Sequence, residues 1–412
     1  MSSQSHNDQA TPLDLSKWAK IPNLMIALGG LLAIIGLALT WSHDGGRQFG
    51  FAWLVGFIFV FSFLFGALFL VLVHHLFDAN WSLPIRRTCE NISSLLFPWG
   101  LVFFIPVALL AKKIYPWMTV TDVAGDHALH AKQPLLTMPG FYLSSLVVLL
   151  ALGFIANQLR KLSIAQDQTG AAEFTHKMRR FAYVGIFLFA FLGTLGVILW
   201  VKSLQHQWFS TMFGVVFFAG SVWMTLATVY VITMMLARTG ALRGVIHGNL
   251  YYFLGSLFFA FTVFYAYVTF SQYFIIWNAN MPEETFWYVQ REKGTWFWWS
   301  MIIIFGHFFL PFLGLLRIDV KKNFCVMGFF CIWAWLMHFT DMVFQILPVV
   351  SPHGVPLKLV ALSAGCAALM LGILIKLYLA KAASAAAYPL KDPRLMESLG
   401  QLNLEAQPQG GK

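Results

Sequence analysis

The sequence predicts an all-α, polytopic membrane protein with about ten transmembrane helices. Two observations lead to this fold class. Apolar residues make up 59% of the 412-residue chain and charged residues only 11%, which reverses the balance of a soluble protein. The apolar residues also gather into stretches of about 20 residues, the length that a helix needs to cross the hydrocarbon core of a bilayer. Most of the protein surface should therefore face lipid.

Ten such stretches follow one another along the chain, with short polar breaks between most of them. The predicted spans cover residues 21–41, 51–75, 94–111, 135–157, 181–201, 208–236, 250–278, 296–316, 323–346 and 357–379. Between the second and third spans, residues 85–94 form an amphipathic piece that we expect at the membrane interface. Residues 112–134 and 158–180 are predicted to be the longest loops.

The polar chain ends set the predicted domain organisation. Residues 1–20 form an N-terminal segment, residues 21–380 the ten-helix transmembrane domain and residues 381–412 a C-terminal tail. No Ala-x-Ala cleavage site precedes the first span, so an uncleaved start is expected. The tail is rich in Ala, Pro and Gln from Ala383 onward, and we expect it to fray.

The Lys and Arg residues predict the orientation in the membrane. They are far more frequent in the N-terminal segment, the even-numbered loops and the tail than in the odd-numbered loops. Because positively charged loops stay in the cytoplasm, both termini should be cytoplasmic. The tryptophans of the opposite interface then form an aromatic belt, namely Trp277, Trp287, Trp296, Trp298 and Trp299. The net charge of +10 sits at helix ends and forms no basic stripe, so nucleic acid is not an expected partner.

Three ionisable residues inside the spans are candidates for function. His307 lies near the middle of the eighth span, and His338 and Asp341 lie three residues apart in the ninth, on one helical face. A charge inside a span is costly unless it faces protein or water. A His beside a carboxylate can pass a proton, because the imidazole titrates near neutral pH. The alternative is a buried structural hydrogen bond that ties the ninth span to its neighbours.

Other histidines and acidic residues favour less specific interpretations. His74 and His75 end the second span, where headgroup contact or helix capping is expected. His206 lies in the short turn before the sixth span, and Glu283 and Glu284 begin a short surface helix opened by Pro282. These three residues are candidates for docking a partner, and the alternative is an ordinary solvated loop.

The sequence predicts neither a metal site nor a redox centre on this chain. Its cysteines form no CxxC pair and no haem-attachment motif, and they are Cys89, Cys325, Cys331 and Cys366. The group Asp126-His127-x-x-His130 could bind a metal, but such clusters in flexible loops usually do not. His307 and His338 differ in predicted depth, so they are not expected to ligate a haem. If the protein belongs to a redox system, its cofactors should sit on partners.

Four motifs in order resemble one known family. They are HQWFSTMFG at His206–Gly214, SQYFIIWNANMPEE at Ser271–Glu284, HFFLPFLGLLR at His307–Arg317, and HFTD at His338–Asp341 followed by Pro348. Together they resemble the F subunit of bacterial alternative complex III, a quinol:cytochrome c oxidoreductase. One departure is the lack of an acidic residue just before the first motif, where this chain has Lys202 and Gln205.

The resemblance implies an NrfD-like fold, related to the polysulfide-reductase membrane subunit, with two four-helix bundles and two extra helices. It implies a subunit of the bacterial inner membrane that binds no metal and lies beside a multihaem cytochrome c, an iron–sulfur subunit and a sister NrfD-like subunit. Haem c and iron–sulfur clusters would belong to those partners. In this family quinol oxidation is assigned mainly to the sister subunit, and the F subunit is given roles in assembly and in a proton route, for which His307, His338 and Asp341 are the matching polar positions.

The leading hypothesis is therefore an integral membrane subunit of a quinol-oxidising respiratory complex, not catalytic alone. An independent secondary transporter is the first alternative, since ten spans with sparse buried charges also fit a carrier. The second alternative is a subunit that binds quinol directly, with His338 and Asp341 near the mouth of an apolar pocket.

Overall fold

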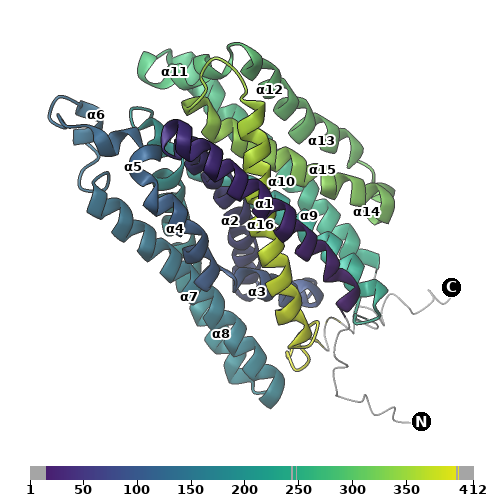
Figure 1. The fold of residues 1–412 in the computed structure, drawn as a ribbon. Coiled ribbons are helices and arrows are strands. Elements are labelled where there is room, and N and C mark those ends of the chain that lie inside the picture. The colour runs from purple at the N-terminus through teal and green to yellow at the C-terminus, as the bar shows by residue number, and fades with distance from the viewer. Residues whose placement is uncertain (1–14, 243–244, 247, 396–397, 399–412) are drawn as a thin grey trace, which may run out of the picture.

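The computed structural model describes residues 15–242, 245–246, 248–395 and 398, which form helices and the connections between them (Figure 1). Nine helices of this described part are long and apolar enough to span a membrane, and a bent pair adds a tenth. The predicted all-α, multi-pass membrane fold is thereby confirmed. Of the predicted terminal segments, residues 1–14 and 399–412 lie outside the described residues.

The long helices match the predicted spans in number and order. They are α1 (Lys20–Asp44), α2 (Arg47–Leu76), α7 (Met138–Thr169), α8 (Ala172–Trp200), α9 (Phe213–Arg238), α10 (Gly248–Ala279), α12 (Thr295–Ile303), α15 (Phe324–Ile346) and α16 (Leu357–Ala383). The helix α12 continues through a π-helical segment, η5 (Ile304–Phe309), into α13 (Leu310–Gly314). The third span is the bent pair: α3 (Leu83–Ser93) turns by 41° into η2 (Leu96–Gly100) and α4 (Leu101–Leu109).

Helix α2 lies at the centre of the molecule. In its most apolar stretch 89% of the residues are buried, against 11% in α1. It contacts α1, α3, α8, α9, α15 and α16. On one side of it lie α4, α7 and α8, on the other α9, α10, α12 and α15, and the antiparallel pair α1–α16 covers it (Figure 1). A helix that is apolar all round is buried in this way.

Glycines let the helix axes approach closely at two contacts. A side chain at Gly29 of α1 would place its Cβ 2.7 Å from the carbonyl oxygen of Gly365 in α16. A Cβ at Gly66 of α2 would lie 2.6 Å from the carbonyl oxygen of Ser221 in α9. Glycines at these positions thus serve close helix packing.

Both ends of the bundle carry short helices. At the end where α1 begins and α16 ends, called here the termini face, lie α3 and α14 (Ile318–Lys322). The opposite face carries α5 (Ala111–Ile114), α6 (His127–His130) and α11 (Pro282–Arg291), visible at the top of Figure 1. The acidic start predicted for a helix opened by Pro282 is confirmed, with Glu283 and Glu284 in the first turn of α11.

The loop predicted at 158–180 is wrong. Helices α7 and α8 continue through it and are separated only by Gly170, which has a φ of 72°, and Ala171. The charges of this segment, among them Arg160 and Lys161, mark where the helices leave the apolar layer and not where they end. A helix of 32 residues is about 48 Å long, well beyond the roughly 30 Å of hydrocarbon.

Two further predictions about the termini face are wrong. The amphipathic piece at 85–94 has no face exposed to headgroups or water, because all 11 residues of α3 are buried within the protein. The tail does not fray directly after Ala383: Leu390 donates a backbone hydrogen bond of 2.9 Å to Asp167 of α7, and Asp392 is buried. The reason is the same in both cases, since charges of α3 and of the tail pair with each other.

The close contact of α2 with α9 gives a testable prediction. Gly66→Ala should lower the free energy of unfolding by about 1–3 kcal/mol, because the added methyl meets the backbone of α9. Gly328→Ala in α15 is the matched control: no atom lies within 4 Å of its added Cβ, so stability should be unchanged or rise by up to about 1 kcal/mol. Denaturant unfolding in detergent measures both, and equal losses would contradict the packing argument.

Candidate functional site

The three ionisable residues predicted inside the spans lie in one region of the bundle, between α2, α9, α10 and α15. His307 and His338 are fully buried and Asp341 is 2% exposed. None of them faces lipid. The sequence therefore identified the buried polar positions, and their partners come from helices that are distant in the chain.

His338 is held against α2. Its Nε2 and the hydroxyl of Ser62 are 3.0 Å apart and hydrogen-bonded, while its Nδ1 has no hydrogen-bond partner among the described residues. The backbone of α9 lies beside the ring, because a Cβ at Gly220 would come within 3.1 Å of it. The structural alternative raised by the sequence, a hydrogen bond that ties the ninth span to a neighbour, is thus realised by His338 and Ser62.

His307 is stacked between two aromatic rings. Its ring centroid lies 3.9 Å from that of Trp223 in α9 and 3.8 Å from that of Tyr265 in α10. Neither of its ring nitrogens has a hydrogen-bond partner in the described part of the chain. A buried polar group without a partner is uncommon, and such a nitrogen commonly binds a water molecule or takes part in proton transfer. The residue also lies in the π-helical segment η5, a local widening that occurs often at functional sites.

Asp341 turns away from His338 and toward other groups. Nε2 of Gln345 donates a hydrogen bond of 3.1 Å to its Oδ1, and the side chain of Tyr265 lies near its carboxyl group. The two residues share a buried helical face, as the sequence predicts, but each has its own partners. Tyr265 therefore connects the Asp341 carboxyl to the stacked ring of His307.

From Asp341 the polar groups continue toward the face that carries α11. The backbone carbonyl of Gln345 accepts a hydrogen bond of 3.0 Å from Nη2 of Arg291, whose Nε donates to the carbonyl of Phe344 at 3.1 Å. The Arg291 guanidinium also stacks 3.5 Å above the ring of Trp287. A cation at these last carbonyls of α15 is favourable, because a helix C-terminus is partly negative. Sequence reasoning missed Arg291, and its only signal was its place at the end of an amphipathic helix.

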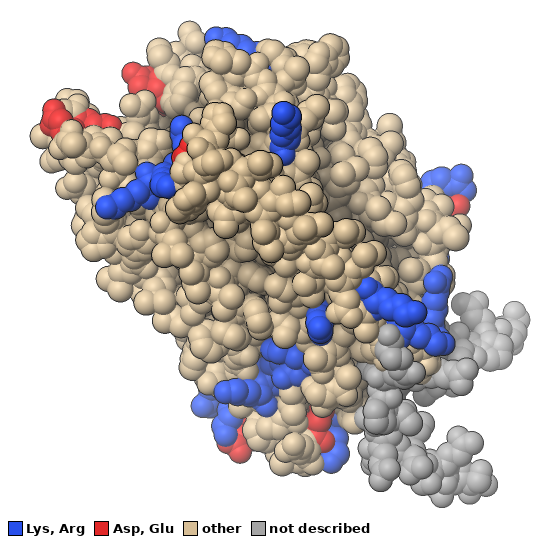
Figure 2. Space-filling view, in the orientation of Figure 1, with Lys and Arg blue, Asp and Glu red and all other residues tan. Residues whose placement is uncertain are grey.

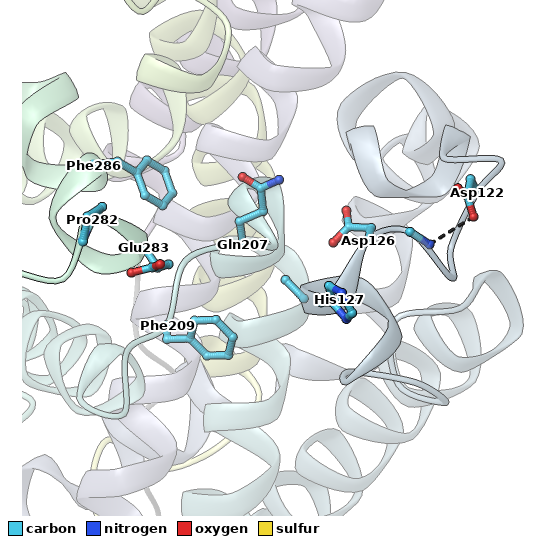
Figure 3. Close-up of a pocket in the computed structure, with 10 residues that line it drawn as sticks. Asp122, Asp126, His127, Gln207, Phe209, Pro282, Glu283 and Phe286 are labelled. Carbon is cyan, nitrogen blue, oxygen red and sulfur yellow. Dashed lines mark hydrogen bonds between the residues drawn. The ribbon is translucent and has the colours of Figure 1, made fainter.

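One of the candidate docking residues, Glu283, lines an open hollow on this same face, with a volume of about 810 Å³ (Figure 3). Its lining includes Asp122, Asp126, His127, Gln207, Phe209 and Glu283. Nε2 of His206 lies 2.6 Å from Oδ2 of Asp126. The hydrogen bonds from His206 and from the backbone of Leu129 hold the pKa of Asp126 below its ordinary value. Glu283 is exposed and lines the hollow, whereas Glu284 is half-buried and does not line it.

The metal interpretation of the Asp126–His130 group gains no support from this arrangement. Asp126 accepts a hydrogen bond of 3.0 Å from the backbone of Leu129, and so caps the short helix α6. Within the described ranges, no three His, Cys, Asp or Glu side chains come together as a metal would require.

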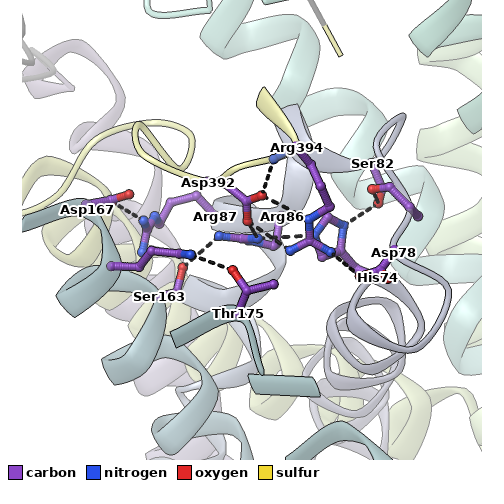
Figure 4. Close-up of polar contacts among 12 residues, drawn as sticks. His74, Asp78, Ser82, Arg86, Arg87, Ser163, Asp167, Thr175, Asp392 and Arg394 are labelled. Atoms are coloured by element: carbon purple, nitrogen blue, oxygen red, sulfur yellow. Dashed lines mark hydrogen bonds and ion pairs between the residues drawn. The ribbon is translucent and has the colours of Figure 1, made fainter. Parts of the chain in front are cut away.

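A second buried polar centre lies at the termini face, around α3 (Figure 4). Arg86 and Arg87 both bind Glu90 at 3.1 Å, all three being almost completely buried. Arg86 also binds Asp392 of the tail, and Arg87 binds Asp167 of α7. The charges of α3 thus cancel within the protein, which explains why this amphipathic helix is buried.

The histidines that end α2 belong to this centre. His74 Nδ1 lies 2.6 Å from the hydroxyl of Ser82, and its Nε2 is 3.2 Å from Nη1 of Arg86. His75 is buried as well, and neither of its nitrogens has a partner among the described residues. The prediction of headgroup contact for His74 and His75 is therefore wrong, because α3 and the tail cover them.

A scan against models of known protein families finds no match to this chain, and a search of curated proteins finds none either.

The tail contact at α3 gives a prediction about stability. Asp392→Asn should lower the free energy of unfolding by about 3–5 kcal/mol, because it leaves the buried Arg86 without one of its counter-charges. Asp319→Asn is the control: Asp319 pairs with Arg317 in an exposed ion pair, so its loss should leave the stability almost unchanged. Thermal unfolding of both variants in detergent tests this.

The same contact should weaken in acid. Burial alone would raise the pKa of Asp392, but the hydrogen bond from Arg394 and the charges of Arg86 and Arg394 hold its pKa well below the ordinary value. A carboxyl whose pKa is lowered by folding stabilises the fold above its unfolded pKa of about 4 and loses this contribution as the pH falls further. The stability difference between wild type and Asp392→Asn should therefore shrink below pH 4, and a difference that grows in acid would contradict the assignment.

Beside the hollow, Lys132 should titrate unusually low. Burial, and then the charge of Lys202, lowers the pKa of Lys132 to about 8. Competitive acetylation followed by mass spectrometry should give Lys132 a midpoint near pH 8, whereas an ordinary lysine titrates near 10.4. Lys202→Met should raise the Lys132 midpoint, and no change would show that burial acts alone.

Proposed function

We propose that this chain is an integral membrane subunit of a quinol-oxidising respiratory complex of the alternative complex III type, and that its bundle provides a route for protons. The observation that carries the proposal is the line of buried polar groups from His307 through Tyr265, Asp341 and Gln345 to Arg291. Buried ionisable groups in a membrane bundle are costly, and they commonly mark proton or ion pathways.

The route has a direction. On the side of Arg291 it ends at α11, next to the face with the open hollow. On the other side, α2 has only apolar residues and one glycine between Ser62 and His74. A polar path that reaches the face with the hollow suits the delivery of protons there, as quinol oxidation by a neighbouring subunit would require.

In this proposal the redox centres belong to the partners. Haem c and iron–sulfur clusters lie on a multihaem cytochrome c and an iron–sulfur subunit, and quinol is oxidised chiefly at a sister NrfD-like subunit. This chain is not catalytic alone, and it resides in a bacterial inner membrane with both termini in the cytoplasm. The face with His206, Glu283 and Glu284 would then lie outside, where these residues would dock the cytochrome-bearing partners.

One observation favours the alternative of a secondary transporter. The third span is broken, with a bend of 41° between α3 and the helix that follows. Broken helices are typical of transporter binding sites. Here, however, the two arginines of α3, Arg86 and Arg87, are already paired with Glu90.

Purification of the tagged chain from its own membranes in mild detergent separates these two functions. A haem c spectrum and co-purifying iron–sulfur and membrane subunits are expected for the respiratory complex. A stable, colourless single polypeptide that catalyses uptake when reconstituted alone would contradict the proposal and establish the transporter.

Within the complex, Asp341→Asn tests the proton route. Quinol oxidation should continue, while the number of protons released per quinol falls, because the amide cannot take up and release a proton. Asp319→Asn, at an exposed position of the short helix α14, should leave both quantities unchanged. Complete loss of quinol oxidation with the complex still assembled would contradict the proton route and favour direct quinol binding at this residue.

A further inference from the structure

Two cations near α3 stand apart from the ion pairs of the termini face. Among the described residues, Arg160 of α7 and Lys381 of α16 form no ion pair with a carboxylate, whereas Arg86, Arg87, Arg179 and Arg394 all do. The charge of Arg160 acts on Lys381, and Arg160 in turn feels the opposed charges of Arg87 and Glu90, which are paired with each other. The corner between α3, α7 and α16 thus holds an excess of positive charge.

Both side chains reach the notch where α3 ends and the chain bends toward α4. Nε of Arg160 donates a hydrogen bond of 2.8 Å to Oδ1 of Asn91. Nζ of Lys381 donates to Ser94, at 2.6 Å to the hydroxyl and 3.3 Å to the carbonyl oxygen. Both cations are only partly buried, so they are accessible from outside the protein.

Helix capping accounts for part of this arrangement and leaves the rest unexplained. Lys381 donates a hydrogen bond to a backbone carbonyl at the end of α3, where the partly negative helix C-terminus favours a cation. Arg160 bonds to a side chain and uses only one of its five N–H donors in doing so. Its remaining donors form the planar fork that matches a phosphate group.

The surface next to the notch is apolar and faces lipid. Phe97 follows the bend and is 44% exposed, and Phe154 of α7 is 55% exposed. The two segments touch, since a Cβ at Gly153 would lie 2.6 Å from the Cβ of Phe97. Figure 2 shows the same division on a larger scale: Lys and Arg gather at the lower end of the molecule, and the band above them is free of charge. Two cations beside exposed aromatic rings match the two parts of a phospholipid.

We propose that Arg160 and Lys381 hold the phosphate of an anionic phospholipid at the termini face, with its acyl chains over Phe97 and Phe154. The negative headgroup supplies the charge that this corner lacks, and basic pockets between transmembrane helices bind such headgroups. This site is independent of the proton route, because it lies at the opposite end of the bundle from Arg291.

Native mass spectrometry of the purified full chain tests the site. Phosphatidylglycerol and phosphatidylcholine with the same acyl chains are titrated against wild type, against Arg160→Gln/Lys381→Gln, and against the control Lys161→Gln/Lys376→Gln. The control removes the same charge from the same two helices, but at exposed positions. Wild type and control should prefer phosphatidylglycerol, and the first double variant should bind it roughly 10- to 30-fold more weakly.

Three results would overturn the proposal. The first is an unchanged preference in Arg160→Gln/Lys381→Gln, and the second is an equal loss in the control, which would indicate general attraction to positive charge. The third is displacement of the lipid by inorganic phosphate at similar concentration, which would identify a site for the free anion. If the double variant does not fold, Arg160→Gln alone, whose amide can still donate to Asn91, should weaken binding several-fold, and unchanged binding overturns the site.

Discussion

The arrangement of the bundle depends on the close packing around α2. This helix is apolar on every side, so it has no face to offer to water and takes the centre. The lipid is as apolar as α2, so burial from water does not hold the neighbouring helices against it. Close van der Waals packing between the helices stabilises the bundle instead. Glycines of α2 allow the close approach of α9 and α16. The positions of the polar residues then follow from which faces of the neighbours meet α2.

The two buried polar centres solve the same physical problem in different ways. The arginines of α3 itself, Arg86 and Arg87, each lie next to carboxylates, which makes this centre costly to disturb. In the middle of the bundle the groups are few, and both nitrogens of His307 lack partners. In a centre whose charges are already paired, an added proton would break an ion pair. A centre with free nitrogens and a carboxyl group in reach can accept one and pass it on.

The sequence predicted those features that the bilayer itself imposes. The thickness of the membrane dictates the length of the spans, and the cost of charge in lipid shows that His338 and Asp341 face inward. It did not predict the partners, because Asp392 lies 306 positions from Arg86 and no local pattern connects them. Hydropathy likewise indicates where α7 and α8 leave the lipid. It does not indicate where the helices end, which is why a loop was predicted between them. The role of Arg291 could not be predicted, because its partners are backbone carbonyls, which every residue carries and no sequence pattern marks.

The distance along the chain between Arg86 and Asp392 has a consequence for biosynthesis. Helix α3 enters the membrane early, with two arginines that Glu90 alone cannot neutralise. The second carboxylate partner of Arg86, Asp392, is synthesised only after α16. Until then Arg87 has Glu90 and Asp167 as carboxylate partners, whereas Arg86 has Glu90 alone. Docking of the tail therefore marks the passage from a membrane-inserted chain to a finished subunit.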